Sequence, residues 1–212
     1  VTVLRKGVKI DTVNSWEITK AGLARMMVGR DVVFRVQRDD LERGKPILEM
    51  RGVKACNDLG LECVRGIDLG LHQREILGVA GVAGNGQKEL FEVLIGMRQA
   101  EDGQVLLNDE VISGKSVGFI RTKGMAHVPS DRIKEGLVMD FSIAENMILG
   151  SEWDQPFRKG LQLNNKVIRK FANESMDAYE IAAPSIDHRT GSLSGGNLQK
   201  VVLAREIGSN PQ

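Results

Sequence analysis

The sequence predicts an α/β fold, and two observations carry this prediction. Short apolar segments with the length of strands alternate with longer segments whose apolar residues recur at helical spacing. One such strand is expected at 75–80 and runs into the glycine-rich turn 81–86, with a helix expected directly afterwards at 87–97. A strand, a glycine-rich turn and a helix in this order are typical of loops that bind phosphate through backbone N–H groups.

Length and composition limit the classes of protein that this chain can represent. It has 212 residues, with 29 lysines and arginines against 28 aspartates and glutamates. This length suits one or two domains, and the balanced charge does not indicate a nucleic acid as partner. No stretch approaches the ~18 apolar residues that cross a bilayer, and the start does not resemble a signal peptide. We therefore expect a soluble, cytoplasmic chain.

The first part of the chain is expected to form a small unit and a linker. Residues 1–10 are predicted to form two short strands around a glycine turn, and a short helix is expected over 17–28. The charged stretch 35–45 has the composition of a linker. None of these segments carries chemistry by itself.

The rest of the chain alternates between predicted strands and helices. Strands are expected at 47–53, 61–71, 102–107 and 125–129. Ser142 and Glu145 form the pattern of a capping box, which opens a helix that runs to residue 149. A longer helix is expected over 167–181, and its inward-facing residues are Ile168, Phe171, Ala172, Ser175 and Met176.

Cysteines and histidines give no sign of a metal site or of nucleophilic catalysis. Cys56 and Cys63 are too few for a disulfide framework and are interpreted as ordinary thiols. His72, His127 and His188 have no metal-like spacing and no obvious acidic companion. We therefore assign no catalytic residue and no metal ligand.

The glycine-rich turn follows part of the phosphate-loop pattern Gly-x-x-x-x-Gly-Lys-[Ser/Thr]. Gly81 and Gly86 occupy the two glycine positions, with Gly84 and Asn85 between them. Backbone donors in such a loop are able to hold phosphate oxygens. Taken alone, however, the turn is equally consistent with an ordinary tight turn.

The positions after the turn depart from this pattern. Gln87 stands where the lysine belongs, Lys88 stands where the Mg²⁺-binding hydroxyl belongs, and Glu89 adds a negative charge. A glutamine cannot neutralise the charge of the phosphates. Lys88 is displaced by roughly 100° around the helix, so its side chain is expected to point elsewhere. We expect weak nucleotide binding and little or no hydrolysis at this loop.

A second segment combines glycines with a helix start and is the most specific motif of the chain. It consists of Ser192, Leu193, Ser194, Gly195, Gly196 and Asn197. Apolar residues follow at helical spacing, and Ser194 is expected to cap this helix by accepting a hydrogen bond from a backbone N–H. Gly195 and Gly196 leave the backbone donors open to an anion at the positive end of the helix.

This segment resembles the signature loop of ATP-binding-cassette (ABC) ATPases, which is Leu-Ser-Gly-Gly-Gln in its commonest form. The Asn-x-Gln-Lys variant found here is similar to the second cassette of sugar and nucleoside importers. The order and spacing of the glycine-rich turn and this loop also match such a cassette. Residues 128–132, Val-Pro-Ser-Asp-Arg, resemble its Q-loop region, with Ser130 and Asp131 in Q-loop-like positions and Ser130 replacing the metal-contacting glutamine.

The resemblance implies a RecA-like P-loop core with an antiparallel β subdomain and a helical subdomain that carries the signature. It places the tail of a preceding cassette and a linker at 1–45, and the β subdomain and P-loop core of the second cassette at 46–134. The helical subdomain is expected at 135–207, and 208–212 is expected to return to the core. In the family, the strand with the Mg²⁺-site aspartate and the catalytic glutamate follows such a return.

The resemblance also implies a function in ATP-driven import of simple sugars or nucleosides. ATP and Mg²⁺ are the implied cofactors, bound weakly at the chain's own loop or in trans. Ser194, Gly195 and Gly196 are expected to contact ATP held by a first cassette of the same polypeptide. The other implied partners are transmembrane permease subunits and, indirectly, an extracytoplasmic substrate-binding protein, so the chain is expected at the cytoplasmic face of the membrane.

Two other classes of function stay open. A stand-alone P-loop enzyme requires catalytic carboxylates within the chain, and Asp131 and Glu135 are the candidates near a strand end. A non-catalytic pseudo-ATPase that braces the permease requires none. Residues 131–137 are consistent with a permease-facing surface and equally with a solvated turn. Mg²⁺-dependent ATP binding discriminates between these possibilities, and the fragment alone is expected to be inactive.

Overall fold

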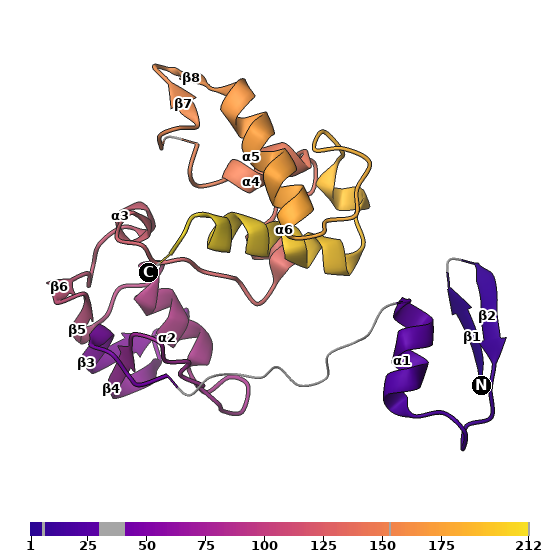
Figure 1. Cartoon of the computed structure of the whole chain (residues 1–212). Coiled ribbons are helices and arrows are strands. Elements are labelled where there is room, and N and C mark those ends of the chain that lie inside the picture. Colours follow the sequence, from indigo (N-terminus) through magenta and orange to yellow (C-terminus); the bar gives the residue numbers. More distant parts are fainter. Residues whose placement is uncertain (6, 30–40, 153, 212) are drawn as a thin grey trace. The chain divides into compact units, whose positions relative to one another are not determined.

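The computed structural model describes residues 1–5, 7–29, 41–152 and 154–211. They divide into two compact units, Val1–Glu42 and Arg43–Gln212, and each unit is described by itself (Figure 1). The expected linker over 35–45 lies outside the described residues up to residue 40, and its last part has no regular structure.

The first unit contains the two strands and the helix that the sequence predicts. Strands β1 (Thr2–Arg5) and β2 (Val8–Thr12) pair antiparallel, and helix α1 spans Lys20–Val28. The helix begins later than residue 17 because Thr19 caps it, its side chain accepting the Gly22 N–H at 3.1 Å.

A four-stranded antiparallel sheet begins the second unit, with strands in the order β4-β3-β5-β6 (Figure 1). The strands are β3 (Pro46–Cys56), β4 (Glu62–His72), β5 (Asp102–Leu107) and β6 (Glu110–Val111). Helix α2 (Gln87–Leu94) packs on β3 and β4, and helix α3 (Val117–Thr122) follows the sheet. The strands expected at 47–53, 61–71 and 102–107 are therefore confirmed.

The core of this part lies between one face of the sheet and the helices α2 and α3. Alternate residues of β3 point into it, as the period of a strand requires. Each fully buried aliphatic side chain contributes roughly 1.5–3 kcal/mol. Its buried members include Met50, Val53, Ala55, Val64, Leu90, Val93, Leu94, Val105 and Ile120.

The remainder of the second unit is mainly helical. Its elements are η1 (Arg132–Gly136), α4 (Ile143–Ile148), β7 (Arg158–Lys159), β8 (Gln162–Leu163), α5 (Asn165–Ala178), η2 (Thr190–Ser192) and α6 (Gly195–Gly208). Helices α4, α5 and α6 pack against one another around a second apolar core (Figure 1). The inward-facing residues expected on α5 all belong to this core or pack against it, apart from Ser175, which is buried as well.

The capping box at the start of α4 is confirmed. Ser142 Oγ accepts the Glu145 N–H at 3.2 Å, and Glu145 Oε2 accepts the Ser142 N–H at 2.7 Å. The two bonds satisfy donors that a helix start otherwise leaves open.

Two of the strands that the sequence predicts do not form. Residues 75–80 and 125–129 have no strand assignment, and Ile76 and Val79 are 76% and 43% exposed. Every strand pair among the described residues is antiparallel. A strand of a parallel core sheet depends on hydrogen bonds to its neighbours, and no described segment pairs with these two.

No helix of the described ranges has the length and apolar content that crossing a membrane requires.

Candidate functional site

The glycine-rich turn joins the exposed segment 75–80 to helix α2. Gly86 has φ 89° and lies against β4, where a Cβ would stand 2.5 Å from the carbonyl oxygen of Cys63. Gly84 has φ 88° with open space around it. The Asn85 N–H donates to the Val82 carbonyl at 3.3 Å and closes the turn. The backbone therefore reverses sharply in this turn. At position 86 only glycine fits, because of the positive φ and the nearby carbonyl oxygen.

The side chain at the lysine position of the pattern folds back onto the turn. Gln87 Nε2 donates to the Val82 carbonyl at 3.2 Å. The same amide occupies the space that a side chain on Gly81 would need. The neutral amide of Gln87, hydrogen-bonded to the turn itself, thus stands where the phosphate-loop pattern places a lysine.

The charge of Lys88 is directed along the side of α2. Its Nζ lies 3.5 Å from Glu92 Oε1, and Glu92 Oε2 lies 2.7 Å from Arg98 Nη2. Arg98 also pairs with Asp58 at 2.6 Å, and this hydrogen bond lowers the pKa of Asp58. Lys88 is therefore part of a charge network on the helix.

Glu89, in the first turn of α2, brings a carboxylate near β4. Burial raises the pKa of the Cys63 thiol, and the charge of Glu89 raises it further. An intact phosphate loop supplies a cation to the phosphates and a hydroxyl to Mg²⁺. Gln87 and Lys88 supply neither group in this arrangement, so these side chains do not fit Mg²⁺-bound triphosphate.

The loop before α6 is exposed at its glycines. Ser194, the N-cap residue, has an extended backbone, and Ser194, Gly195 and Gly196 are all exposed. The expected cap hydrogen bond is not formed, because Ser194 Oγ instead accepts from Asn197 Nδ2 at 3.0 Å. The first N–H groups of a helix have no partner within it, so they remain available at this surface.

The base of this loop is held by side chains. Asn197 Oδ1 accepts the Ala182 N–H at 3.0 Å, and Asn197 Nδ2 donates to the Ala182 carbonyl at 3.3 Å. Ser192 Oγ donates to the Arg189 carbonyl at 2.6 Å. The side chain of Leu193 packs against the helical core. Asn197, Ser192 and Leu193 thus anchor the loop, and their side chains are not directed at a ligand.

The Q-loop-like residues Ser130 and Asp131 directly precede the π-helix η1. Asp131 Oδ1 accepts the N–H groups of Ile133 and Lys134, both at 3.1 Å. The Lys134 N–H, together with that of Ile133, lowers the pKa of Asp131. Ser130 and Glu135 are exposed. Asp131 caps η1, and the described residues hold no metal-binding group that would unite it with Glu135.

The fold brings Arg132, to which no motif of the sequence assigns a role, close to the loop before α6. Arg132 Nη2 lies 3.1 Å from the position of a Cβ on Gly195. Within the described ranges, its buried Nε has no hydrogen-bond partner. The sequence distance between η1 and α6 hid this proximity, although Arg132 belongs to the Val-Pro-Ser-Asp-Arg segment.

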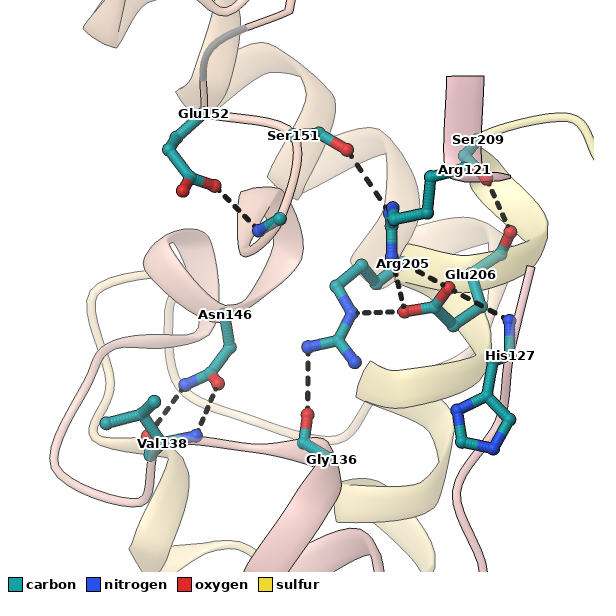
Figure 2. A network of polar contacts seen from close by, with 11 residues as sticks. Arg121, His127, Gly136, Val138, Asn146, Ser151, Glu152, Arg205, Glu206 and Ser209 are labelled. Carbon is teal, nitrogen blue, oxygen red and sulfur yellow. Dashed lines mark hydrogen bonds and ion pairs between the residues drawn. The ribbon is translucent and has the colours of Figure 1, made fainter. Parts of the chain in front are cut away.

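A buried ionic network holds the far end of α6 (Figure 2). Glu206 is 2% exposed and lies between Arg205, whose Nε is 2.7 Å away, and Arg121 of α3, whose Nη1 is 3.2 Å away. Arg205 Nη1 also donates to the Gly136 carbonyl at 2.8 Å. Helix α6 is thereby joined to both η1 and α3, a connection that the sequence pattern did not indicate.

One histidine differs from the sequence prediction. His72 has an acidic companion, since its Nδ1 lies 3.0 Å from Glu75 Oε2. The His72 N–H also binds this carboxylate and lowers the pKa of Glu75. Arg43 contacts the same carboxylate, so these three side chains form a polar cluster at the end of β4.

The glycine-rich turn and the loop before α6 both lie in a range that matches a known protein family. The family model described as ABC transporter matches residues 64–212, which include both the glycine-rich turn and the loop before α6. The chain belongs to the ABC transporter family. The glycine-rich turn and the loop before α6 therefore both lie in the part of the chain that matches this family.

Known relatives align with this chain over its whole given length. It is 38% identical to the glucose import ATP-binding protein TsgD13 of Haloferax volcanii and 37% identical to the guanosine import ATP-binding protein NupO of Bacillus subtilis. Each comparison covers 100% of this chain, but only 39% and 41% of the respective relative. The chain therefore spans about two fifths of the length of these relatives.

Solved structures confirm the fold class. A nucleotide-free ATP-binding cassette from an ABC transporter superposes with a TM-score of 0.62 at 18% identity, covering 79% of this chain and 66% of that one. CbiO1 from Clostridium perfringens, part of the transporter complex cbiONQ, superposes with a TM-score of 0.60 at 20% identity, covering 80% and 63%. The arrangement of the sheet and the helical part is thus that of an ABC cassette.

Proposed function

We propose that this chain is part of the ATP-binding subunit of an importer for simple sugars or nucleosides. Its signature loop completes the ATP site of a partner cassette, while its own P-loop is degenerate. The single observation that carries this proposal is the contrast between the two loops. The signature loop is exposed and firmly anchored, whereas the P-loop has a neutral side chain folded onto it.

The signature loop supplies backbone donors on a rigid support. Gly195 and Gly196 stand at the N-terminus of α6, a helix of 14 residues whose inner face is buried through Leu198, Val201 and Val202. Oriented N–H groups at a helix start favour negative charge and need no rearrangement when the charge arrives. This chain thus contributes donors that stabilise the terminal phosphate of a nucleotide bound elsewhere.

The chain's own P-loop contributes little to hydrolysis in this proposal. Mg²⁺-bound ATP in a competent site supplies the phosphoryl group that water attacks. Here the Gln87 amide is hydrogen-bonded to Val82, and Lys88 is paired with Glu92. Binding a nucleotide therefore requires Gln87 to leave the loop and leaves the phosphates without the usual cation.

The substrate class and the partners follow from the relatives. Two of the relatives are named for import of glucose and of guanosine, which supports a sugar or a nucleoside as cargo. We further propose a first cassette on the same polypeptide, permease subunits, and an extracytoplasmic substrate-binding protein as partners. The chain then acts as a peripheral component at the cytoplasmic face of the membrane.

Calorimetric titration with Mg·ATP tests the assignment of the P-loop. The chain is compared with a double variant, Gln87→Lys with Lys88→Ser, which restores the phosphate-loop pattern. We expect weak binding by the unaltered chain and clearly tighter binding by the variant. Tight binding by the unaltered chain would contradict the degenerate-site proposal, because it would mean that Lys88 reaches the phosphates.

Transport by the complete assembly tests the role of the signature loop. Gly195→Glu places a carboxylate at the exposed helix start, where it repels phosphate. We expect transport and ATP hydrolysis to be abolished while the first cassette still binds ATP. Retained transport would contradict the proposal. A pseudo-ATPase that only braces the permease is the alternative, and it predicts normal transport for Gly195→Glu.

A further inference from the structure

Arg132 lies beside the exposed glycines of the signature loop. Its Nη2 is 3.1 Å from the position that a Cβ on Gly195 would occupy, and Gly195 is the first residue of α6. A guanidinium in this place adds a full positive charge next to the partial charge of the helix start. Both groups face a loop that is open to solvent at Ser194 and Gly196.

The charge of Arg132 acts on the neighbouring carboxyl of Asp131 and helps to lower its pKa. Among the described residues, however, no ion pair or hydrogen bond includes the guanidinium of Arg132, and its Nε is buried without a hydrogen-bond acceptor. The neighbouring carboxylate of Asp131 accepts two backbone N–H groups of its own turn. Buried donors are nearly always satisfied in native proteins, so the buried Nε of Arg132 calls for an acceptor that the described residues do not supply.

The fold holds η1 against α6 at the end opposite Arg132. The Gly136 carbonyl accepts Arg205 Nη1 at 2.8 Å. A Cβ on Gly136 would lie 3.1 Å from Pro129 and 3.3 Å from Val202, so the two elements are closely packed there. The C-terminal end of the turn that carries Arg132 is therefore held against α6.

We propose that Arg132 is an anion-binding residue of the signature site and contacts the terminal phosphate of the nucleotide held by the partner cassette. This inference rests on the proposed function of the signature loop. A guanidinium matches phosphate through two parallel N–H···O bonds, which a lysine cannot reproduce. Residues 130–133 line an open hollow of about 350 Å³ that gives space beside Arg132.

The test uses the complete transporter that contains this chain, reconstituted in lipid vesicles. Arg132→Gln removes the charge and keeps much of the side-chain volume, and Arg132→Lys keeps the charge without the planar fork. Lys134→Gln is the matched control, because it removes an exposed cation from the same turn. We expect kcat/KM for ATP to fall roughly 10- to 100-fold in Arg132→Gln, less in Arg132→Lys, and to stay near wild type in the control.

A second readout separates phosphate contact from a structural role. The preference of the transporter for Mg·ATP over Mg·ADP is measured by competition with a fluorescent nucleotide. Loss of a contact to the terminal phosphate lowers this preference in Arg132→Gln, whereas local loosening of η1 weakens both nucleotides equally. An unchanged preference, equal to that of Lys134→Gln, would overturn the inference.

Gly195→Glu distinguishes this failure from failure of the proposed function. If Gly195→Glu abolishes hydrolysis while Arg132→Gln behaves as wild type, the signature site stands and only the role of Arg132 is wrong. If Gly195→Glu leaves hydrolysis unchanged, the proposed function itself is wrong, and the inference about Arg132 fails with it.

Discussion

Arg121 and Glu206 form an ion pair, with Nη1 3.2 Å from Oε2, across 85 residues of sequence. Arg121 follows Ile120, which belongs to the core of the sheet, and Glu206 follows helix residues that belong to the helical core. The carboxylate also binds Arg205, which reaches the Gly136 carbonyl (Figure 2). One buried glutamate thus connects α3, η1 and α6.

Replacing this glutamate is expected to be strongly destabilising. Glu206→Gln leaves Arg205, with 8% side-chain exposure, and Arg121 without their carboxylate. Breaking a buried ion pair typically costs about 3–5 kcal/mol. Urea unfolding measures the change. Glu174→Gln is the control, since Glu174 pairs with Lys170 at the surface, and the loss of this pair is expected to stay within about 0.5 kcal/mol. Equal effects of the two variants would contradict the importance of the network.

The capping box predicts a dependence of stability on pH. The Ser142 hydroxyl and backbone N–H lower the pKa of Glu145 below its ordinary value. A lowered pKa in the folded state means that the carboxylate stabilises the fold above the unfolded pKa, and this stabilisation is lost as the pH falls through the folded pKa. Wild type is therefore expected to be more stable than Glu145→Gln near neutral pH.

The difference in unfolding free energy between these two proteins is expected to shrink between about pH 5 and pH 3. Urea unfolding over this pH range measures it. The Glu145→Gln variant keeps the hydrogen bond from the backbone N–H of residue 145 to Ser142 Oγ. The comparison therefore isolates the contribution of the carboxylate to the unfolding free energy. A difference that does not vary with pH would contradict the prediction.

Two glycines of the P-loop with nearly the same φ are expected to respond differently to alanine. Gly84→Ala meets open space, so only the left-handed conformation opposes it, at about 1–2 kcal/mol. Gly86→Ala has the same conformational cost and also brings a Cβ to 2.5 Å from the Cys63 carbonyl oxygen. Thermal unfolding is expected to show a clearly larger loss for Gly86→Ala. Similar losses would mean that β4 moves away easily.

Asn197 is expected to matter for the order of the signature loop. Asn197→Ala removes two hydrogen bonds to Ala182 and one to Ser194. The loss is expected to be about 0.5–1.5 kcal/mol, because these hydrogen bonds are exposed and water replaces the lost partner. Hydrogen exchange at the Ala182 amide reports the local opening directly. Asn173→Ala is the matched control, since Asn173 is an exposed residue of α5 whose side chain donates to the Arg169 carbonyl within the same helix.

The sequence predicted structural features correctly where they depend on residues that are close together along the chain. Ser142 and Glu145 form their capping box because a helix start brings residues three apart together. The same reasoning placed β3, β4 and β5, where alternating apolar residues face one core. It failed at 75–80 and 125–129, because apolar composition cannot supply the neighbouring strand on which a parallel ladder depends.

The site followed the same division. The sequence by itself determined that a glycine-rich turn before α2 and a Ser-Gly-Gly helix start at α6 occur in one chain, since both are defined by adjacent residues. Only the tertiary structure decided that Gln87 donates to the Val82 carbonyl and that Asn197 donates to the Ser194 hydroxyl. It likewise decided that Arg132 lies beside Gly195. The physical reason is that rotamers and contacts between distant segments depend on the packing of η1, α2 and α6, which no spacing along the chain encodes.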